Sequence, residues 1–169
     1  MYRAIHPDLL AMKTAYDAIS ITCDKVFPEE ESEEYGACVC EINRKLVRFR
    51  VAKITPTKVG QFVTFWKRSA GGPIAPYNVT DIFDLLMVSV RDAGYFGHFI
   101  FPKAVLLQQG LLSQDGQGGK RAMRVYPPWV ITESLQARKT QEWQGVYFYE
   151  IAPAFNASRI QKLFALTSP

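Results

Sequence analysis

A nearly continuous apolar run, Phe83–Val90, most strongly limits the folds open to this chain of 169 residues. Its sequence, Phe-Asp-Leu-Leu-Met-Val-Ser-Val, lacks the strict apolar–polar alternation of a strand with one wet face. Such a run is typical of a strand covered on both faces, so it predicts a sheet with packed layers on either side. Elsewhere the period is helical: Leu9, Met12 and Tyr16 recur on one stripe.

The predicted elements follow one another as a helix, a run of strands, and then helices with one late strand. This order predicts an α/β (α+β) fold with a central mixed β-sheet flanked by helices, in a single domain over residues 1–169. No apolar run is long enough to span a membrane. Strands are predicted over 37–42, 46–54, 61–68, 83–90, 98–101 and 146–150, and helices over 9–19, 103–109, 132–144 and 156–166.

Charge is distributed unevenly along the chain. Residues 1–41 hold nine acidic and three basic side chains, whereas residues 42–169 hold seven acidic and seventeen basic ones. Within residues 44–68 there are eight bases and no acid. This window cannot neutralise itself locally, so its cations must face the acidic N-terminal segment, water or an anionic partner.

Basic strands interleaved with Phe and Trp favour a nucleic-acid partner, because cations neutralise phosphates and aromatic faces stack on bases. In the predicted strand, Arg48 and Arg50 point away from the face of Val47 and Phe49. The preferred function is therefore binding of DNA or RNA through a basic sheet face. The predicted phosphate contacts are Arg44, Lys45, Arg48, Arg50, Lys58, Lys67 and Arg68, with Trp66 as a stacking partner and Arg121, Arg124, Arg138 and Lys139 as additional contacts.

Lys53 is the unusual residue of the second predicted strand. It shares the apolar face of Val51, where an ammonium is costly unless it is paired or takes part in chemistry. A lysine beside carboxylates that hold Mg²⁺ or Mn²⁺ is the arrangement of metal-dependent phosphodiester cleavage. The alternative function is therefore a nuclease, although Val51 cannot coordinate a metal. The candidate carboxylates are Glu33, Glu34, Glu41 and Asp84.

A third hypothesis is a module that binds a small molecule or a partner protein. It depends on the aromatic residues of the C-terminal third, which can line an apolar pocket. These residues are Tyr126, Trp129, Trp143, Tyr147, Phe148 and Tyr149.

The three cysteines, Cys23, Cys38 and Cys40, are predicted to be free thiols in the core of a cytoplasmic protein. The odd count and the absence of an apolar leader segment favour a reducing compartment. His6 and His98 are the two histidines, which excludes a histidine-rich metal site.

Several blocks of the chain are similar to one family. They are 32–37, 49–58, 60–64, 66–68, 98–103, 119–122, 124–129 and 140–144. Together these blocks resemble the MepB family of small bacterial proteins, some of which are encoded beside a multidrug efflux pump and its repressor. The resemblance covers about residues 31–149, and it would link the small-molecule or partner-binding alternative to efflux.

The wider pattern resembles restriction-endonuclease-like (PD-(D/E)XK) proteins, in which a hairpin carries an acid and a Glu/Gln-x-Lys element. Lys53 matches the lysine of this element, and Glu34 or Glu41 would stand in place of the first acid. Val51 departs from the acidic position. The resemblance implies a restriction-endonuclease-like core with a degenerate site, which binds nucleic acid without efficient cleavage. No metal or cofactor is then expected, and Mg²⁺ or Mn²⁺ belongs to the nuclease alternative.

Overall fold

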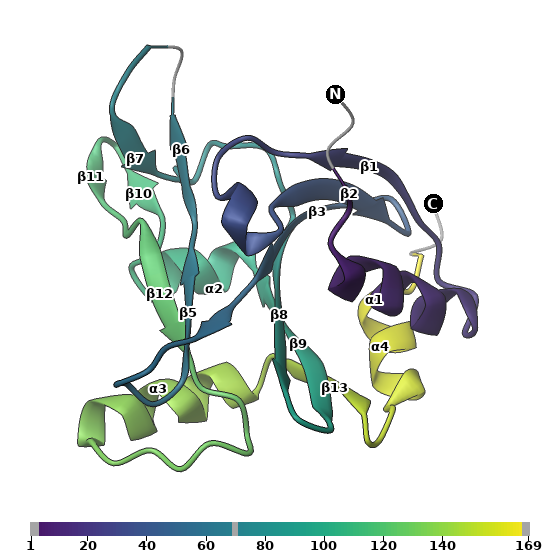
Figure 1. The fold of residues 1–169 in the computed structure, drawn as a ribbon. Coiled ribbons are helices and arrows are strands. Elements are labelled where there is room, and N and C mark those ends of the chain that lie inside the picture. Colours follow the sequence, from purple (N-terminus) through teal and green to yellow (C-terminus); the bar gives the residue numbers. More distant parts are fainter. Residues whose placement is uncertain (1–3, 69–70, 167–169) are drawn as a thin grey trace.

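The computed structural model of the protein describes residues 4–68 and 71–166. Its centre is a six-stranded sheet in the order β1 (Cys23–Pro28), β2 (Cys38–Ile42), β3 (Lys45–Val51), β8 (Leu85–Asp92), β9 (Tyr95–Pro102) and β13 (Phe148–Ala152) (Figure 1). β3 and β8 are parallel and the other neighbouring pairs are antiparallel. The predicted α+β class with a central mixed sheet is therefore confirmed.

Smaller sheets and helices complete the fold. β5 (Gln61–Thr64) pairs with both β12 (Ala122–Val125) and β4 (Lys53–Ile54), β6 (Trp66–Arg68) pairs with β7 (Ile74–Pro76), and β10 (Ser113–Gln114) pairs with β11 (Gln117–Gly118). The helices are α1 (Pro7–Asp17), the short 3₁₀ turn η1 (Glu33–Tyr35), α2 (Lys103–Gln108), α3 (Leu135–Gly145) and α4 (Ala157–Leu163). No helix in the described part of the chain is long and apolar enough to cross a membrane.

The strand that the apolar run predicted, β8, is buried on both faces from Leu85 to Val90. Leu85 and Met87 belong to a core with α1 and α4, and Leu86 and Val88 belong to a second core with α2, β5 and β12. Figure 1 shows α1 and α4 on one side of the central sheet, and α2, α3 and the smaller sheet on the other. The sheet is thus covered on both faces, as we expected from the lack of apolar–polar alternation in residues 83–90.

The second predicted strand, 46–54, is divided in two. β3 ends at Val51, and Ala52 donates its backbone N–H to Ser89 of β8 before Lys53 begins β4 in the smaller sheet. Lys53 is therefore an exposed residue, and its predicted place on the apolar face of β3 was wrong. The chain thus passes at Ala52 from the central sheet into the smaller sheet of β4, β5 and β12. The spacing of apolar residues alone does not show such a change of sheet.

Candidate functional site

The arginines of β3 are internal ion-pair partners. Arg50 is completely buried, and its Nη1 donates to Glu29 Oε2 at 2.5 Å. Arg48 donates to the other oxygen of Glu29 and lies 4.7 Å from the ring centroid of Tyr77. Because the loop before η1 brings Glu29 over this face, Arg50 cannot reach a phosphate. The predicted role of Arg50 in binding nucleic acid was wrong, and Arg48 shares the same carboxylate.

The remaining predicted bases do not form one surface. Arg44 and Lys45 lie at the β2–β3 turn, where the neighbouring Asn43 donates to the carbonyl of Phe164 beyond α4. Lys67 is paired with Asp81 at 2.6 Å. On β6, Arg68 is exposed beside the ring of Trp66, and Lys58 is exposed in the turn between β4 and β5. Figure 1 places the β2–β3 turn on the side of α1 and α4, opposite β5 and β6.

Of the carboxylates considered for a nuclease site, Glu33 and Glu34 are neighbours in η1, whereas Glu41 and Asp84 lie in other parts of the fold. Glu34 is 3.3 Å from Lys53 Nζ, which also lies 4.5 Å from the ring centroid of Tyr35. Glu41 pairs with Lys25 on the outer strands, and Asp84 accepts the backbone N–H of Leu46 at 2.8 Å. Across residues 4–68 and 71–166, no three His, Cys, Asp or Glu side chains converge on a metal-sized site. The geometry therefore adds no support to the nuclease alternative.

The three cysteines are free and lie in the core, as predicted. Cys23, Cys38 and Cys40 are free, buried and part of the core under α1 and α4. Burial raises the pKa of the Cys38 thiol to about 12. Cys38 therefore stays a neutral thiol at neutral pH and serves in packing.

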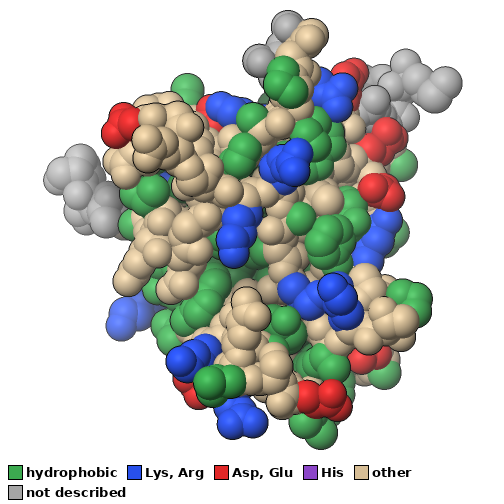
Figure 2. All heavy atoms as spheres, turned by 90° about the vertical axis from the view of Figure 1, so that its left-hand side faces the viewer, with side chains coloured by type: hydrophobic (Ala, Val, Ile, Leu, Met, Phe, Trp, Pro, Cys, Tyr) green, Lys and Arg blue, Asp and Glu red, His purple; other side chains and the backbone are tan. Residues whose placement is uncertain are grey.

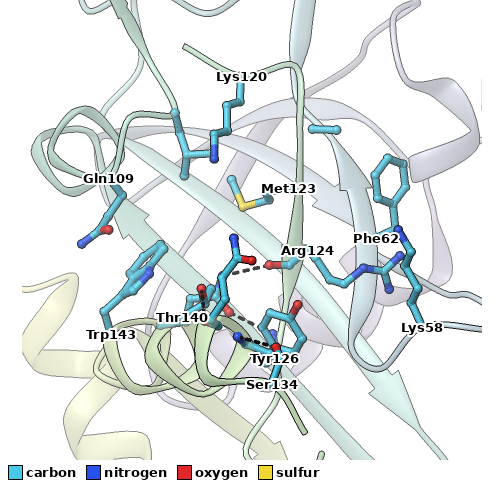
Figure 3. Close-up of a pocket in the computed structure, with 15 residues that line it drawn as sticks. Lys58, Phe62, Gln109, Lys120, Met123, Arg124, Tyr126, Ser134, Thr140 and Trp143 are labelled. Atoms are coloured by element: carbon cyan, nitrogen blue, oxygen red, sulfur yellow. Dashed lines mark hydrogen bonds between the residues drawn. The ribbon is translucent and has the colours of Figure 1, made fainter. Parts of the chain in front are cut away.

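A groove of about 520 Å³ lies between the smaller sheet and α3. We call it the cationic groove, because Lys58, Lys120 and Arg124 line it and no Asp or Glu does so in the described part of the chain. Figure 3 shows Lys58, Phe62 and Arg124 on one side, Gln109 and Trp143 on the opposite side, and Lys120 above. On this side of the molecule, Lys and Arg side chains surround a hollow and acidic ones lie nearer the margins (Figure 2).

Hydrogen bonds between α3 and β12 shape the floor of the cationic groove. The buried Gln144 donates from Nε2 to the carbonyl of Arg124 at 3.0 Å, and its Oε1 accepts the N–H of Tyr126 at 2.8 Å. Arg124 then reaches across β5 to Thr55 Oγ1 at 3.0 Å and to the carbonyl of Gly60 at 3.3 Å. This guanidinium thus orders the turn that carries Lys58.

The three cations of the cationic groove have no counter-charge within the described residues. Arg124 bonds only to a hydroxyl and to backbone carbonyls, and it lies 5.9 Å from the ring centroid of Phe62. Lys58 and Lys120 are exposed and form no ion pair in the described part of the chain. Clustered cations without acids create a positive potential that attracts anions.

Sequence reasoning found only part of this groove. Lys58 and Arg124 were among the predicted phosphate contacts, but Lys120 and the α3 side chains Gln136 and Thr140 were not. Polar uncharged residues on a helix give no sequence signal for a binding surface, because the same residues occupy ordinary wet faces. The predicted aromatic pocket is also dispersed: Tyr126 and Trp143 line the cationic groove, whereas Trp129 and Phe148 line a separate cleft.

Comparison with known proteins gives a consistent result. A family model described as MepB-like matches residues 29–150. A solved structure of MepB is 30% identical, with a TM-score of 0.76, and the match covers 88% of this chain and 99% of that chain. A bacterial homing endonuclease is 13% identical with a TM-score of 0.46, over 82% of this chain and 86% of that one. No curated protein matches the chain. The chain belongs to the MepB-like family.

Proposed function

We propose that the protein binds nucleic acid in the cationic groove, without efficient cleavage. The observation that carries this proposal is the convergence of Lys58, Lys120 and Arg124, from two separate segments, on a groove that no described acidic residue lines. Phosphate contacts of this kind supply most of the affinity of sequence-independent binding. Arg124 presents a planar guanidinium, which suits phosphate oxygens.

Groups around the cationic groove extend this proposed surface. Arg121 directly follows Lys120 and is exposed, whereas the exposed Arg138 and Lys139 of α3 do not line the groove. The half-buried Trp143 and Tyr126 offer ring edges and faces to bases at the groove wall. This surface replaces the β3 face as the proposed interface.

The protein is proposed to act in the cytoplasm, where DNA and RNA are both present. Its three free cysteines support this location, because disulfides are rare in reducing compartments. Three buried thiols in one core would be candidates for oxidation in a secreted protein.

A salt titration with matched double variants tests the proposal. Fluorescence anisotropy of a labelled 20-nucleotide DNA or RNA measures affinity at several salt concentrations. Lys58→Ala/Lys120→Ala should lower the slope of log K against log salt by about 1.4 to 1.8, since each lost phosphate contact contributes about 0.7 to 0.9. Arg44→Ala/Lys45→Ala removes the same charge on the other side of the sheet and should leave the slope nearly unchanged.

Two results would refute this proposal. One is the absence of measurable binding of either nucleic acid at about 50 mM salt, where phosphate contacts are strongest. The other is an equal loss of slope in the two double variants, which would show that only net charge matters and that the groove has no special role.

A further inference from the structure

A second cleft, of about 440 Å³, lies at the ends of β9 and β13 and has no lining residue in common with the cationic groove. We call it the aromatic cleft. It is bounded by the Tyr95 end of β9, the rigid segment at Pro128, and the start of α4 at Asn156. Nothing in the proposed binding of nucleic acid uses it.

Three aromatic rings form one wall of the aromatic cleft. Tyr95 and Trp129 are stacked, with centroids 5.0 Å apart and planes 16° apart, and Trp129 meets Phe148 edge-to-face at 5.8 Å. Gly97 makes this arrangement possible, because a Cβ at that position would lie 2.6 Å from Cζ of Phe148. Tyr95 is 45% exposed, so part of the wall faces solvent.

The two charged residues of the aromatic cleft, Arg159 and Glu150, differ in their interactions with the rest of the protein. Arg159 donates to the carbonyl of Val146, just after α3, and to that of Phe148 on the edge strand β13, and its guanidinium lies 4.1 Å from the ring centroid of Tyr149. The N–H groups of this guanidinium therefore satisfy backbone carbonyls on and just before the open edge strand of the sheet. Glu150 lines the cleft, is half-buried, and forms no ion pair within residues 4–68 and 71–166.

An aromatic wall with an unpaired carboxylate beside it is the environment that attracts an organic cation.

We propose that the aromatic cleft binds a small organic cation, such as a quaternary ammonium. The cation lies against the exposed side of Tyr95, whose other face is stacked on Trp129, and the carboxylate of Glu150 supplies the opposite charge. Arg159 does not oppose this binding strongly, because its guanidinium is directed at the β13 edge and at Tyr149. The site is independent of the cationic groove.

Calorimetric titration with benzyltrimethylammonium tests the proposal, with benzyl alcohol and benzenesulfonate as neutral and anionic probes. The cation should bind saturably and more tightly than either other probe. Tyr95→Ala should weaken it roughly 3- to 30-fold, as expected for one cation–π contact. Glu150→Gln keeps the shape of the side chain, and it should remove most of the preference for the cation over benzyl alcohol.

Thermal unfolding followed by circular dichroism controls for folding of the variants, and Tyr95 lies at an exposed hairpin end, where truncation is tolerated. The Lys58→Ala/Lys120→Ala variant should bind the cation as the unaltered protein does. No saturable binding of benzyltrimethylammonium, equal binding of the neutral probe, or tighter binding of the sulfonate would each overturn the proposal. None of these outcomes bears on the nucleic-acid titration, so the two proposals fail separately.

Discussion

Replacing Glu29 with glutamine removes the carboxylate that serves two guanidinium groups. Arg50 has no exposed side-chain surface, and the side chain of Arg48 is only 19% exposed. Removing one partner of a buried ion pair leaves an uncompensated charge and costs about 3 to 5 kcal/mol. We expect the lower end, about 3 kcal/mol, because the glutamine amide oxygen still accepts one hydrogen bond.

Urea unfolding measures this loss. With a denaturant dependence of about 2 kcal/mol/M, Glu29→Gln should lower the midpoint by about 1.5 M. The control is Asp17→Asn, which removes an exposed pair with Lys13 and should cost at most about 0.5 kcal/mol. Adding Arg50→Met to Glu29→Gln should recover much of the loss, because an apolar side chain then replaces the unpaired charge. A midpoint shift in Glu29→Gln no larger than in Asp17→Asn would refute the reasoning.

Three further predictions concern the core and the nuclease alternative. Gly97→Ala should lower the free energy of unfolding by about 1 to 3 kcal/mol, because its Cβ would overlap the ring of Phe148; an unchanged melting temperature would contradict this. Burial lowers the pKa of His98 to about 3, below the value of about 6.5 in the unfolded chain. Protonation therefore favours unfolding, and the contribution of the neutral imidazole is lost as the pH falls from about 6.5 toward 3. Between pH 7 and pH 4.5 the unaltered protein should lose about 2 to 3 kcal/mol more than His98→Phe does, and equal losses in urea unfolding would be evidence against this. Plasmid incubated with Mg²⁺ or Mn²⁺ should show no cleavage that depends on Lys53; cleavage that Lys53→Ala abolishes would restore the nuclease hypothesis.

The predicted site differs from the observed groove for a physical reason. Alternation correctly placed Arg48 and Arg50 on the face opposite Val47 and Phe49, which belongs to the core under α1 and α4. Whether that opposite face is wet depends on which other segments cover it. Glu29 approaches from 19 and 21 residues before the two arginines, and no local pattern specifies such a contact.

The central architecture followed from local pattern, since the apolar run at residues 83–90 required a strand with cover on both faces and β8 has it. The spacing at which apolar side chains recur depends on backbone geometry and burial, so it can be recognised from residues that are close together in the sequence. The cationic groove and the aromatic cleft have a different origin. Lys58, Lys120 and Arg124 come together through the pairing of β5 with β12, and Tyr95 meets Trp129 across 34 positions of the chain. Tertiary packing decides which charged residues meet when they are far apart in the sequence. Only the folded chain therefore shows which cations remain without an acidic partner.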